Sequence, residues 1–517
     1  MIPFSAPLND ILWSLTHVAQ ADRLPDWYAD EAAEILGHFA KFTESEIAPL
    51  DAIGDAEGCK LVDGRVQMPT GFGRAYQAYV EGGWHGAALP AEHGGMGLSA
   101  LLSLSSTEIL AGACHAFQMV VGLVPGAART VLNFGTEDQI AATLPGFTSG
   151  EMLATMCLTE PGAGSDLSAI RTKAVETNDG WAITGEKIFI SGGDQDMSPR
   201  IAHLVLARTG AVEDGIKGLS LFLCLSDQCD ATQISVTRIE EKLGLHASPT
   251  CQLRFQNAPG HLIGAKGQGL TAMFTLMNHA RLDVALQGVA HAARARAIAQ
   301  DYCSTRIQGR KADQTPALLC DHADVQRMLG HQRLLEITAR AMVHLTAVEL
   351  ELGERPLLVE FLTPLCKIYA TEAGIQAADL GIQLLGGYGY LREYRVEQTW
   401  RDARITAIYE GTNGIHAATL AGRLLRWKDG AAADAFAAFL STLGLPPAEF
   451  DTWNTLRQQV AQSEHFAPLA HGFSRATLAL FERALWTRFT QLSGAIPTAD
   501  IALAQAALYE PRFSLLR

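Results

Sequence analysis

The sequence predicts an α+β protein in which helical regions stand on either side of a middle antiparallel β domain. Apolar residues recur at helical spacing in DEAAEILGHFAKFTESEI, residues 30–47. Short segments rich in β-forming residues, separated by turn residues, then fill residues 155–258. The helical pattern returns from about residue 268. This order lacks the strand–helix alternation of a doubly wound sheet, so a Rossmann cofactor site is disfavoured.

A chain of 517 residues suggests about three domains, at roughly 100–200 residues per domain. The changes of pattern predict an N-terminal helical domain at 1–154 and a middle β domain at 155–258. They also predict a C-terminal helical bundle at 259–428 and a helical extension of unassigned purpose at 429–517. Inside the β domain, the segment WAITGEKIFIS predicts a hairpin that turns around Gly185.

The net charge and the cysteines indicate which classes of binding partner this protein has and where in the cell it is located. A formal net charge of -15 argues against nucleic acid or an anionic membrane as the main partner. Nine scattered cysteines without C-x-x-C spacing, and histidines without H-x-x-x-H spacing, predict a reduced chain with no metal site. The first residues, MIPFSAPLNDILWSL, lack the basic region and cleavage site of a signal peptide. We therefore expect a cytoplasmic protein.

One uncharged stretch, Ile109 to Ala128, is long enough to span a bilayer. It contains His115, Gln118, Pro125 and several small residues. These residues favour a buried helix of a large helical bundle over a membrane span.

Two segments have the composition of functional loops. MCLTEPGAGSD, residues 156–166, follows a predicted strand, and its glycines allow backbone to approach a ligand closely. An ordinary glycine turn between strands explains that segment equally well. ITAIYEGTNG, residues 405–414, places the carboxylate of Glu410 at the end of an apolar run. From the residues alone, a helix-end carboxylate bonded to nearby N–H groups is the favoured interpretation of Glu410.

Four motifs together give a more specific indication. MCLTEPGAGSD, ITGEKIFISGG, LLGGYGY and RDARITAIYEGTNG resemble, in this order and at these separations, the acyl-CoA dehydrogenase family of flavoenzymes. The resemblance covers about residues 30–428. RLPDWYADEAAEIL, FISGGDQDM, KLGLHASPTCQL and STRIQGR further resemble the 3-methylmercaptopropionyl-CoA dehydrogenase-like branch. The resemblance implies a C-terminal four-helix bundle, with FAD bound between the β domain and the bundle.

The resemblance also assigns roles to individual residues. Glu410 matches the catalytic base, and Phe189 stands where the family has a Trp beside the flavin. The implied substrate-binding residues are Ser165, Asn278, Arg281 and Gly411. The implied FAD-binding residues, of which Arg306, Gln308, Gln383, Gly386 and Gly387 serve a neighbouring subunit, are Leu158, Thr159, Gly164, Ser165, Phe189, Ser191, Arg306, Gln308, Gln383, Gly386, Gly387, Thr412 and Asn413.

The chemistry that the family resemblance implies explains why an acid is needed at position 410. The α-carbon of a thioester is a weak acid, and a carboxylate in a dry, apolar site is a stronger base than one in water. The hydride of the β-carbon leaves towards the flavin on the other face of the acyl chain. The implied reaction converts an acyl-CoA to a trans-2-enoyl-CoA, with electrons passing to an electron-transferring flavoprotein and the enzyme forming a homodimer or homotetramer.

Two other functions stay open at this stage. An acyl-CoA oxidase has the same fold and base but passes its electrons to oxygen. A non-catalytic family member acts as an interaction scaffold or a nucleic-acid-binding protein through a C-terminal extension. The arginines of residues 429–517 are spread among acidic residues, which argues against the nucleic-acid role.

Overall fold

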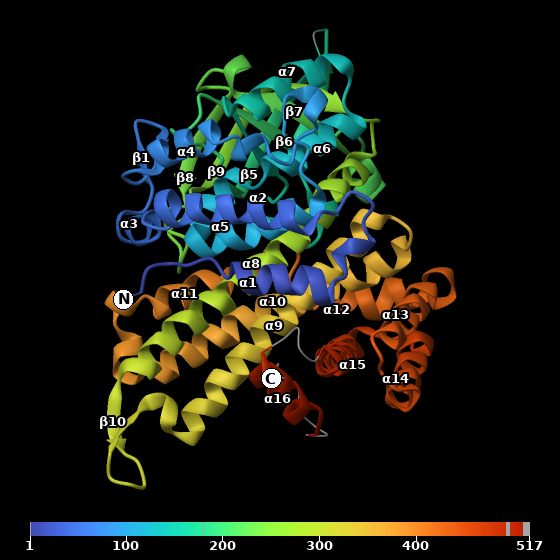
Figure 1. The fold of residues 1–517 in the computed structure, drawn as a ribbon. Coiled ribbons are helices and arrows are strands. Elements are labelled where there is room, and N and C mark those ends of the chain that lie inside the picture. Colours follow the sequence, from blue (N-terminus) through green and yellow to red (C-terminus); the bar gives the residue numbers. More distant parts are fainter. Residues whose placement is uncertain (1, 179, 493–496, 510–517) are drawn as a thin grey trace. The chain divides into compact units, whose positions relative to one another are not determined.

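The computed structural model describes residues 2–178, 180–492 and 497–509, except for the side chains of residues 274–279 and 509 (Figure 1). The chain forms two compact units that cut across the predicted domains. The helical unit comprises Met1–Lys41, Ala100–Gly112 and Arg281–Arg517, and the β unit comprises Phe42–Ser99 and Ala113–Ala280. The predicted domain limits at 154, 258 and 428 stay predictions.

The β unit is built on a seven-stranded sheet with the strand order β3-β6-β4-β5-β9-β7. An additional pairing of β6 with β7 closes this path, and β8 pairs with β9. The pairing is antiparallel as predicted, except that β3 and β4 lie parallel to β6. The strands are β3 (Met152–Cys157), β4 (Lys173–Thr177), β5 (Gly180–Ser191), β6 (Arg200–Arg208), β7 (Leu219–Leu225), β8 (Ile234–Ile239) and β9 (Thr250–Ile263).

The predicted hairpin turn around Gly185 is wrong, because β5 runs without a break from Gly180 to Ser191. The chain instead turns between β4 and β5, where Thr177 pairs with Gly180. Gly185 serves a different purpose inside the strand. A Cβ at this position would come 2.3 Å from Oγ1 of Thr172, so the glycine permits close approach of a neighbouring segment.

Helices and a small hairpin complete the β unit. The first turn of α7 shows why its sequence begins a helix there: Thr136 accepts a hydrogen bond from the backbone N–H of Gln139, whose side chain accepts one from the N–H of Thr136. The helices are α3 (Leu50–Glu57), α4 (Phe72–Glu81), α6 (Val124–Phe134) and α7 (Glu137–Ser149), and the hairpin is β1 (Lys60–Val62) with β2 (Arg65–Gln67).

The helical unit is organised around three long helices, the first of which begins in the β unit. These are α8 (Gly269–Thr305), α9 (Ala323–Leu352) and α10 (Pro356–Leu385). The remaining elements are α1 (Leu8–Trp13), α2 (Ala29–Phe42), the hairpin β10 (Ile307–Arg310) and β11 (Pro316–Leu318), α11 (Val396–Ala403), α12 (Asn413–Thr419), α13 (Ala431–Thr442), α14 (Phe450–Gln462), α15 (Ala470–Gln491) and α16 (Thr498–Tyr509).

The C-terminal extension is part of the core of the helical unit. Trp486 of α15 has no exposed surface, and its Nε1–H donates to Oγ1 of Thr338 over 3.1 Å. Glu482, also buried, accepts a hydrogen bond of 3.0 Å from the hydroxyl of Tyr369 in α10. Because buried polar groups on α15 find their partners on α9 and α10, the extension is packed into the bundle.

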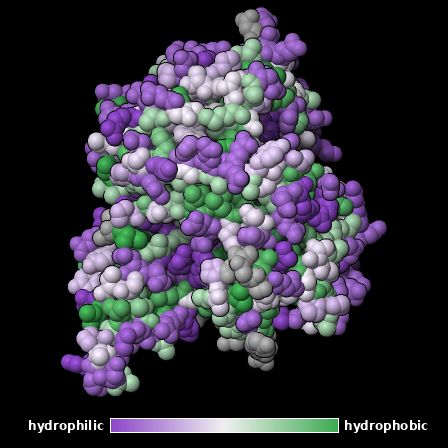
Figure 2. All heavy atoms as spheres, viewed as in Figure 1, coloured by the Kyte–Doolittle hydropathy of each residue, from purple (hydrophilic) through white to green (hydrophobic). Residues whose placement is uncertain are grey.

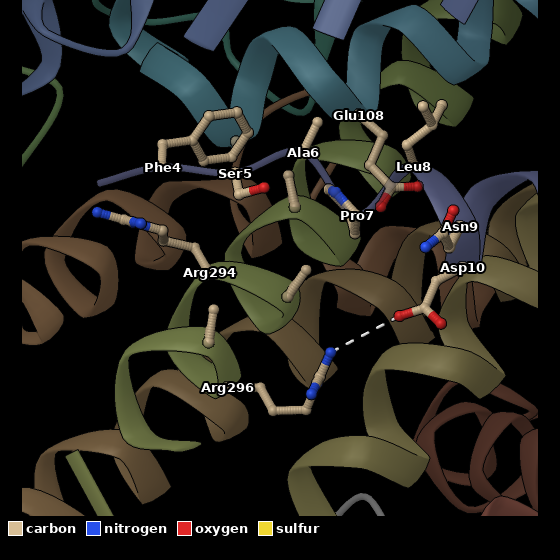
Figure 3. Close-up of a pocket in the computed structure, with 14 residues that line it drawn as sticks. Phe4, Ser5, Ala6, Pro7, Leu8, Asn9, Asp10, Glu108, Arg294 and Arg296 are labelled. Atoms are coloured by element: carbon tan, nitrogen blue, oxygen red, sulfur yellow. Dashed lines mark ion pairs between the residues drawn. The ribbon is translucent and has the colours of Figure 1, made fainter. Parts of the chain in front are cut away.

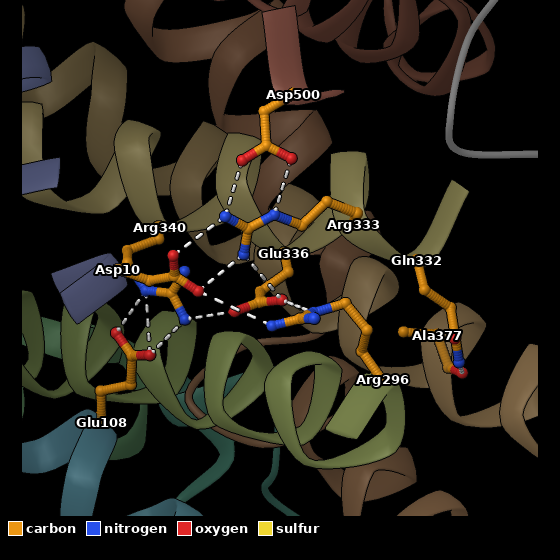
Figure 4. Close-up of polar contacts among 9 residues, drawn as sticks. All are labelled: Asp10, Glu108, Arg296, Gln332, Arg333, Glu336, Arg340, Ala377 and Asp500. Carbon is orange, nitrogen blue, oxygen red and sulfur yellow. Dashed lines mark hydrogen bonds and ion pairs between the residues drawn. The ribbon is translucent and has the colours of Figure 1, made fainter. Parts of the chain in front are cut away.

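A buried ion-pair network connects both ends of the chain to α9 (Figure 4). The guanidinium of Arg340 lies 2.7 Å from Glu108 and 2.8 Å from Glu336. Arg333 binds Asp10 at 2.6 Å and Asp500 at 2.8 Å. Burial favours the neutral acid at Glu336, but the surrounding arginines hold its pKa well below the usual range. The network therefore fixes the N-terminal segment and α16 to the same helix.

The uncharged stretch, residues 109–128, covers the second half of α5 (Ala100–Val121) and the first turn of α6. By length and composition alone α5 is able to cross a membrane, yet most of its apolar stretch is buried inside the protein. Its backbone also leaves helical geometry at Cys114. These are features of a core helix.

On the face drawn in Figure 2, hydrophilic residues predominate and hydrophobic ones are scattered among them.

Candidate active site

The loop that carries Glu410 has an unusual backbone. Glu410 has φ +52° and Gly411 has φ +86°, so two successive residues occupy the left-handed region. For a residue with a side chain this conformation costs on the order of 1–3 kcal/mol, and it persists only where the surroundings hold it. Strain of this kind is concentrated at functional sites.

Two buried side chains hold the two carbonyl groups of this loop. The Nε2–H of His416 donates to the carbonyl oxygen of Glu410 over 3.0 Å. Burial lowers the pKa of His416 to about 3, so its ring is a neutral donor. The ammonium of Lys367 donates to the carbonyl oxygen of Gly411 over 2.8 Å. A Cβ at position 411 would lie 3.1 Å from the His416 ring, so a glycine is needed there.

The carboxylate of Glu410 has the properties of a base in a low-dielectric site. Its Oε2 is shielded from solvent and has no hydrogen-bond partner among the described residues. Burial raises the pKa of Glu410, and the nearby cations Arg281 and Lys367 only partly oppose that effect. The Oε2 oxygen therefore does not accept a hydrogen bond from the N–H groups of a helix end in the described part of the chain.

Lys367, which was not predicted from the sequence, lies on α10 and has no exposed surface. Its Nζ also donates to Oδ1 of Asn413 over 3.0 Å. Burial lowers the pKa of Lys367 to about 7, against the opposing effect of Glu410. A signal was present in the sequence, because Lys367 is a lone cation within the apolar run TPLCKIYA.

The two residues after Gly411 use their side chains within the helical unit. Oγ1 of Thr412 accepts a hydrogen bond from the backbone N–H of Ile415 and caps α12. The side-chain amide of Asn413 donates to Thr371 and to Glu372, each over 3.2 Å. Both residues therefore fix the Glu410 loop to the helices around it, and their predicted contacts with a cofactor stay predictions.

A second buried lysine, also missed in the sequence, holds the glycine loop of the β unit. Lys187 of β5 donates to the carbonyl oxygen of Leu158 over 2.9 Å and to Glu160 over 2.8 Å. The backbone N–H of the next residue, Ile188, donates to the carbonyl oxygen of Thr159 over 2.9 Å. The predicted flavin residues Leu158 and Thr159 are thereby fixed beside β5, the strand that carries Phe189 and Ser191.

Phe189 has a backbone and an exposure that packing alone does not explain. Its φ is +59°, rare for an aromatic residue, and 60% of its surface is exposed. It lies at an irregularity in the pairing of β5 with β9, between Lys187 and Ile190. Such irregularities redirect side chains next to active sites. Gly164 and Ser165 are also exposed, and the space beside Gly164 is open.

A third group of predicted residues meets on the surface of the helical unit. The guanidinium of Arg306 lies over the ring of Tyr388, 5.6 Å from its centroid. This contact joins the segment of Arg306 and Gln308 to the loop that follows Gln383. Gln308 lies in the β10–β11 hairpin. Gln383, Gly386 and Gly387, like Arg306 and Gln308, are exposed, and the space beside both glycines is open.

The remaining predicted substrate residues lie on α8. Arg281 is close enough to Glu410 to affect its pKa, and burial lowers the pKa of Arg281 itself. The side chain of Asn278 lies outside the described residues. The helical unit thus brings Arg281, Glu410 and Gly411 together.

A cavity of about 320 Å³ elsewhere in the helical unit contains none of the predicted site residues (Figure 3). It lies between the N-terminal segment Phe4–Asp10, Glu108 and the α8 residues Arg294 and Arg296. The charged groups that line it already have partners: Asp10 pairs with Arg296, Glu108 pairs with Arg340, and Arg294 donates to backbone carbonyls of the N-terminal segment.

Comparison with known proteins gives matches along most of the chain. Residues 29–151 match the N-terminal domain of acyl-CoA dehydrogenases, residues 155–258 the middle domain and residues 267–425 the C-terminal domain. The 3-methylmercaptopropionyl-CoA dehydrogenase of Ruegeria pomeroyi is 39% identical over 485 residues, which cover 89% of this chain and 82% of that protein. A butyryl-CoA dehydrogenase of Syntrophomonas wolfei is 30% identical over 452 residues, covering 80% and 74% respectively.

Solved structures share the fold. The butyryl-CoA dehydrogenase of Megasphaera elsdenii has a TM-score of 0.66 at 25% identity and covers 82% of this chain and 100% of its own. Caenorhabditis elegans ACDH-11 has a TM-score of 0.81 at 18% identity and covers 100% of this chain and 93% of its own. The second likeness shows the fold alone, and it extends over the C-terminal extension.

Proposed function

Since this chain belongs to the acyl-CoA dehydrogenase family, whose members are flavoprotein oxidoreductases, we propose that it converts an acyl-CoA to a trans-2-enoyl-CoA with bound FAD. The observation that carries this proposal is the Glu410 carboxylate. It lies on a strained loop held by two buried donors, and one of its oxygens is shielded from solvent and has no partner in the part of the chain that the structure describes. In this proposal Glu410 removes the α-proton, and its backbone N–H binds the thioester oxygen as charge develops there.

The residues predicted to bind FAD have features that suit a large planar ligand. Phe189 presents an exposed aromatic ring from a strained backbone, and the open space beside Gly164, Gly386 and Gly387 lets a ligand approach the main chain. FAD, when bound, supplies the acceptor for the hydride of the β-carbon. In the proposal, Leu158, Thr159, Gly164, Ser165, Phe189, Ser191, Thr412 and Asn413 hold its flavin end.

We propose that Arg306, Gln308, Gln383, Gly386 and Gly387 bind the FAD of a neighbouring subunit in a homodimer or homotetramer. Gln383 follows Lys367 by 16 residues on α10, which corresponds to about 24 Å along a helix. This separation places Gln383 far from the Glu410 loop. We further propose an electron-transferring flavoprotein as the acceptor and the cytoplasm as the location.

The proposed function is tested by anaerobic mixing of the purified, FAD-loaded protein with a panel of acyl-CoA thioesters. The panel includes 3-methylmercaptopropionyl-CoA and butyryl-CoA, the substrates named in two similar proteins. We expect the flavin absorbance to bleach with at least one of them. A parallel aerobic assay for peroxide distinguishes a dehydrogenase, which needs an added electron acceptor, from an oxidase. Absence of bleaching with the whole panel would contradict the proposal.

Arg306→Ala is expected to weaken FAD retention and subunit assembly together, because Arg306 is exposed on its own subunit and assigned to the cofactor of another. The flavin content after gel filtration and the mass of the eluting species measure both effects. Arg310→Ala, four residues further along the chain in the β10–β11 hairpin, is the matched control, since Arg310 is exposed and has no predicted role. An intact, fully loaded oligomer of Arg306→Ala would contradict the cross-subunit assignment.

A further inference from the structure

We infer that the C-terminal extension positions the loop of the catalytic base, through an ion pair between Arg475 of α15 and Glu372 of α10. This inference rests on the proposed function of Glu410. It gives a role to the extension, for which the sequence provided none. Arg475 and Glu372 are positioning residues, because they act on Glu410 only through other side chains.

A chain of side-chain contacts leads from the extension to the loop of Glu410. Nη1 of Arg475 lies 2.5 Å from Oε2 of Glu372. The other oxygen of that carboxylate, Oε1, accepts a hydrogen bond of 3.2 Å from the side-chain amide of Asn413. Asn413 follows Glu410 by three residues and is the first residue of α12, where the loop ends. The carboxylate of Glu372 therefore joins α15 to the residue at the end of the catalytic loop.

The orientation of the Asn413 side chain explains how the Arg475–Glu372 pair affects the backbone of the loop. Its Nδ2 faces Glu372 and Thr371, so its Oδ1 faces Lys367 and accepts a hydrogen bond of 3.0 Å. Lys367 in turn holds the carbonyl oxygen of Gly411. Fixing the amide of Asn413 thus fixes the donor that holds the left-handed backbone at Gly411, next to Glu410.

The Arg475–Glu372 ion pair is largely shielded from solvent and lies between two packed helices. Both side chains are about three-quarters buried, with exposed fractions of 24% each. The neighbouring Glu482–Tyr369 contact, one to two turns along the same two helices, is buried and keeps α15 and α10 in register. Arg475 therefore reaches Glu372 from a helix that is itself rigidly packed.

The test uses Arg475→Met in the full-length, FAD-loaded protein. Arg483→Met is the matched control: Arg483 lies on the same helix, is 25% exposed and pairs with Glu449 at 2.6 Å, away from the loop. Hydrogen exchange of peptides that cover residues 405–416 reports on the loop without requiring any activity. We expect exchange there to become about fivefold faster or more in Arg475→Met and to stay unchanged in Arg483→Met.

Three further measurements separate positioning from general loss of stability. Exchange in α9 is expected to remain slow in both variants. Arg475→Lys, which keeps the charge, is expected to restore most of the protection. In the Glu372→Gln background, Arg475→Met is expected to add little, since the pair is already broken. Anaerobic bleaching is expected to slow about three- to tenfold in Arg475→Met, because small misplacements of a base reduce the rate.

The outcomes distinguish this inference from the proposed function. Wild-type exchange at residues 405–416 in Arg475→Met would overturn the inference, whatever the bleaching rate. Equal loop exchange in Arg475→Met and Arg483→Met would also overturn it, by showing a general effect of α15. Failure of the wild-type protein to bleach with any acyl-CoA would overturn the proposed function. The exchange result would then still show whether Arg475 positions the loop at residues 405–416.

Discussion

Glu410→Gln is expected to give a yellow, FAD-loaded protein that no longer bleaches when mixed anaerobically with acyl-CoA. Glutamine keeps the size of the side chain and the loop around it, but it removes the group that takes the α-proton. A general base typically contributes about 10²–10⁴-fold to a rate, so the loss of bleaching is expected to be at least in that range. Rapid-mixing absorbance measurements on equally loaded proteins give the ratio.

The control for this change is Glu397→Gln on α11, which removes a carboxylate that pairs with Arg401 at 2.6 Å and has no assigned role in the reaction. We expect that variant to bleach at close to the wild-type rate. Bleaching of Glu410→Gln at the wild-type rate would remove Glu410 as the base.

The pH dependence of wild-type bleaching follows from the raised pKa of Glu410. The base works only after its own proton has left, so the rate is low below the pKa and rises as the pH passes through it. Because burial raises that pKa, the acid limb is expected to lie above the ordinary value of 4.5. This limb is expected to be absent from any residual rate of Glu410→Gln.

Lys187→Met is expected to destabilise the protein by about 3–5 kcal/mol and to reduce FAD retention. The ammonium of Lys187 has no exposed surface and lies 2.8 Å from Glu160, so its removal leaves a largely buried carboxylate without its cation. It also releases the carbonyl oxygen of Leu158 in the predicted flavin loop. Urea unfolding and flavin content after gel filtration measure the two effects.

A control and a rescue accompany this variant. Lys173→Met on the adjacent strand removes an exposed lysine and is expected to change the free energy of unfolding by less than about 0.5 kcal/mol. Adding Glu160→Gln to Lys187→Met removes the unpaired charge and is expected to recover part of the loss. A Lys187→Met protein as stable as the Lys173→Met protein would show that the pair contributes nothing.

The acid stability of the wild type provides a related check on Glu160. Burial alone would raise its pKa, but the Lys187 ammonium and backbone donors leave it below the ordinary value of 4.5. A carboxyl group whose pKa is lowered by folding stabilises the protein above its unfolded pKa. That stabilisation is lost as the pH falls below 4.5 towards the folded pKa.

Patterns of apolar spacing predicted the order of helices and strands because burial fixes that spacing locally. The hairpin around Gly185 was predicted wrongly. A glycine is needed there because Thr172 on a neighbouring segment packs against it, and not because the chain turns at this position. Glu410 was predicted from its motif. The two lysines were not, because Lys187 and Lys367 owe their importance to carbonyl groups that lie 29 and 44 residues away along the chain.

The bond of Arg333 to both Asp10 and Asp500 has a consequence for biosynthesis. The β unit has all of its residues once the ribosome has passed position 280, and it is free to fold first. Asp10 precedes the β unit along the chain, yet its partner Arg333 on α9 is made only after the β unit is complete. The segment around Asp10 is therefore made before the β unit but docks onto α9 after it.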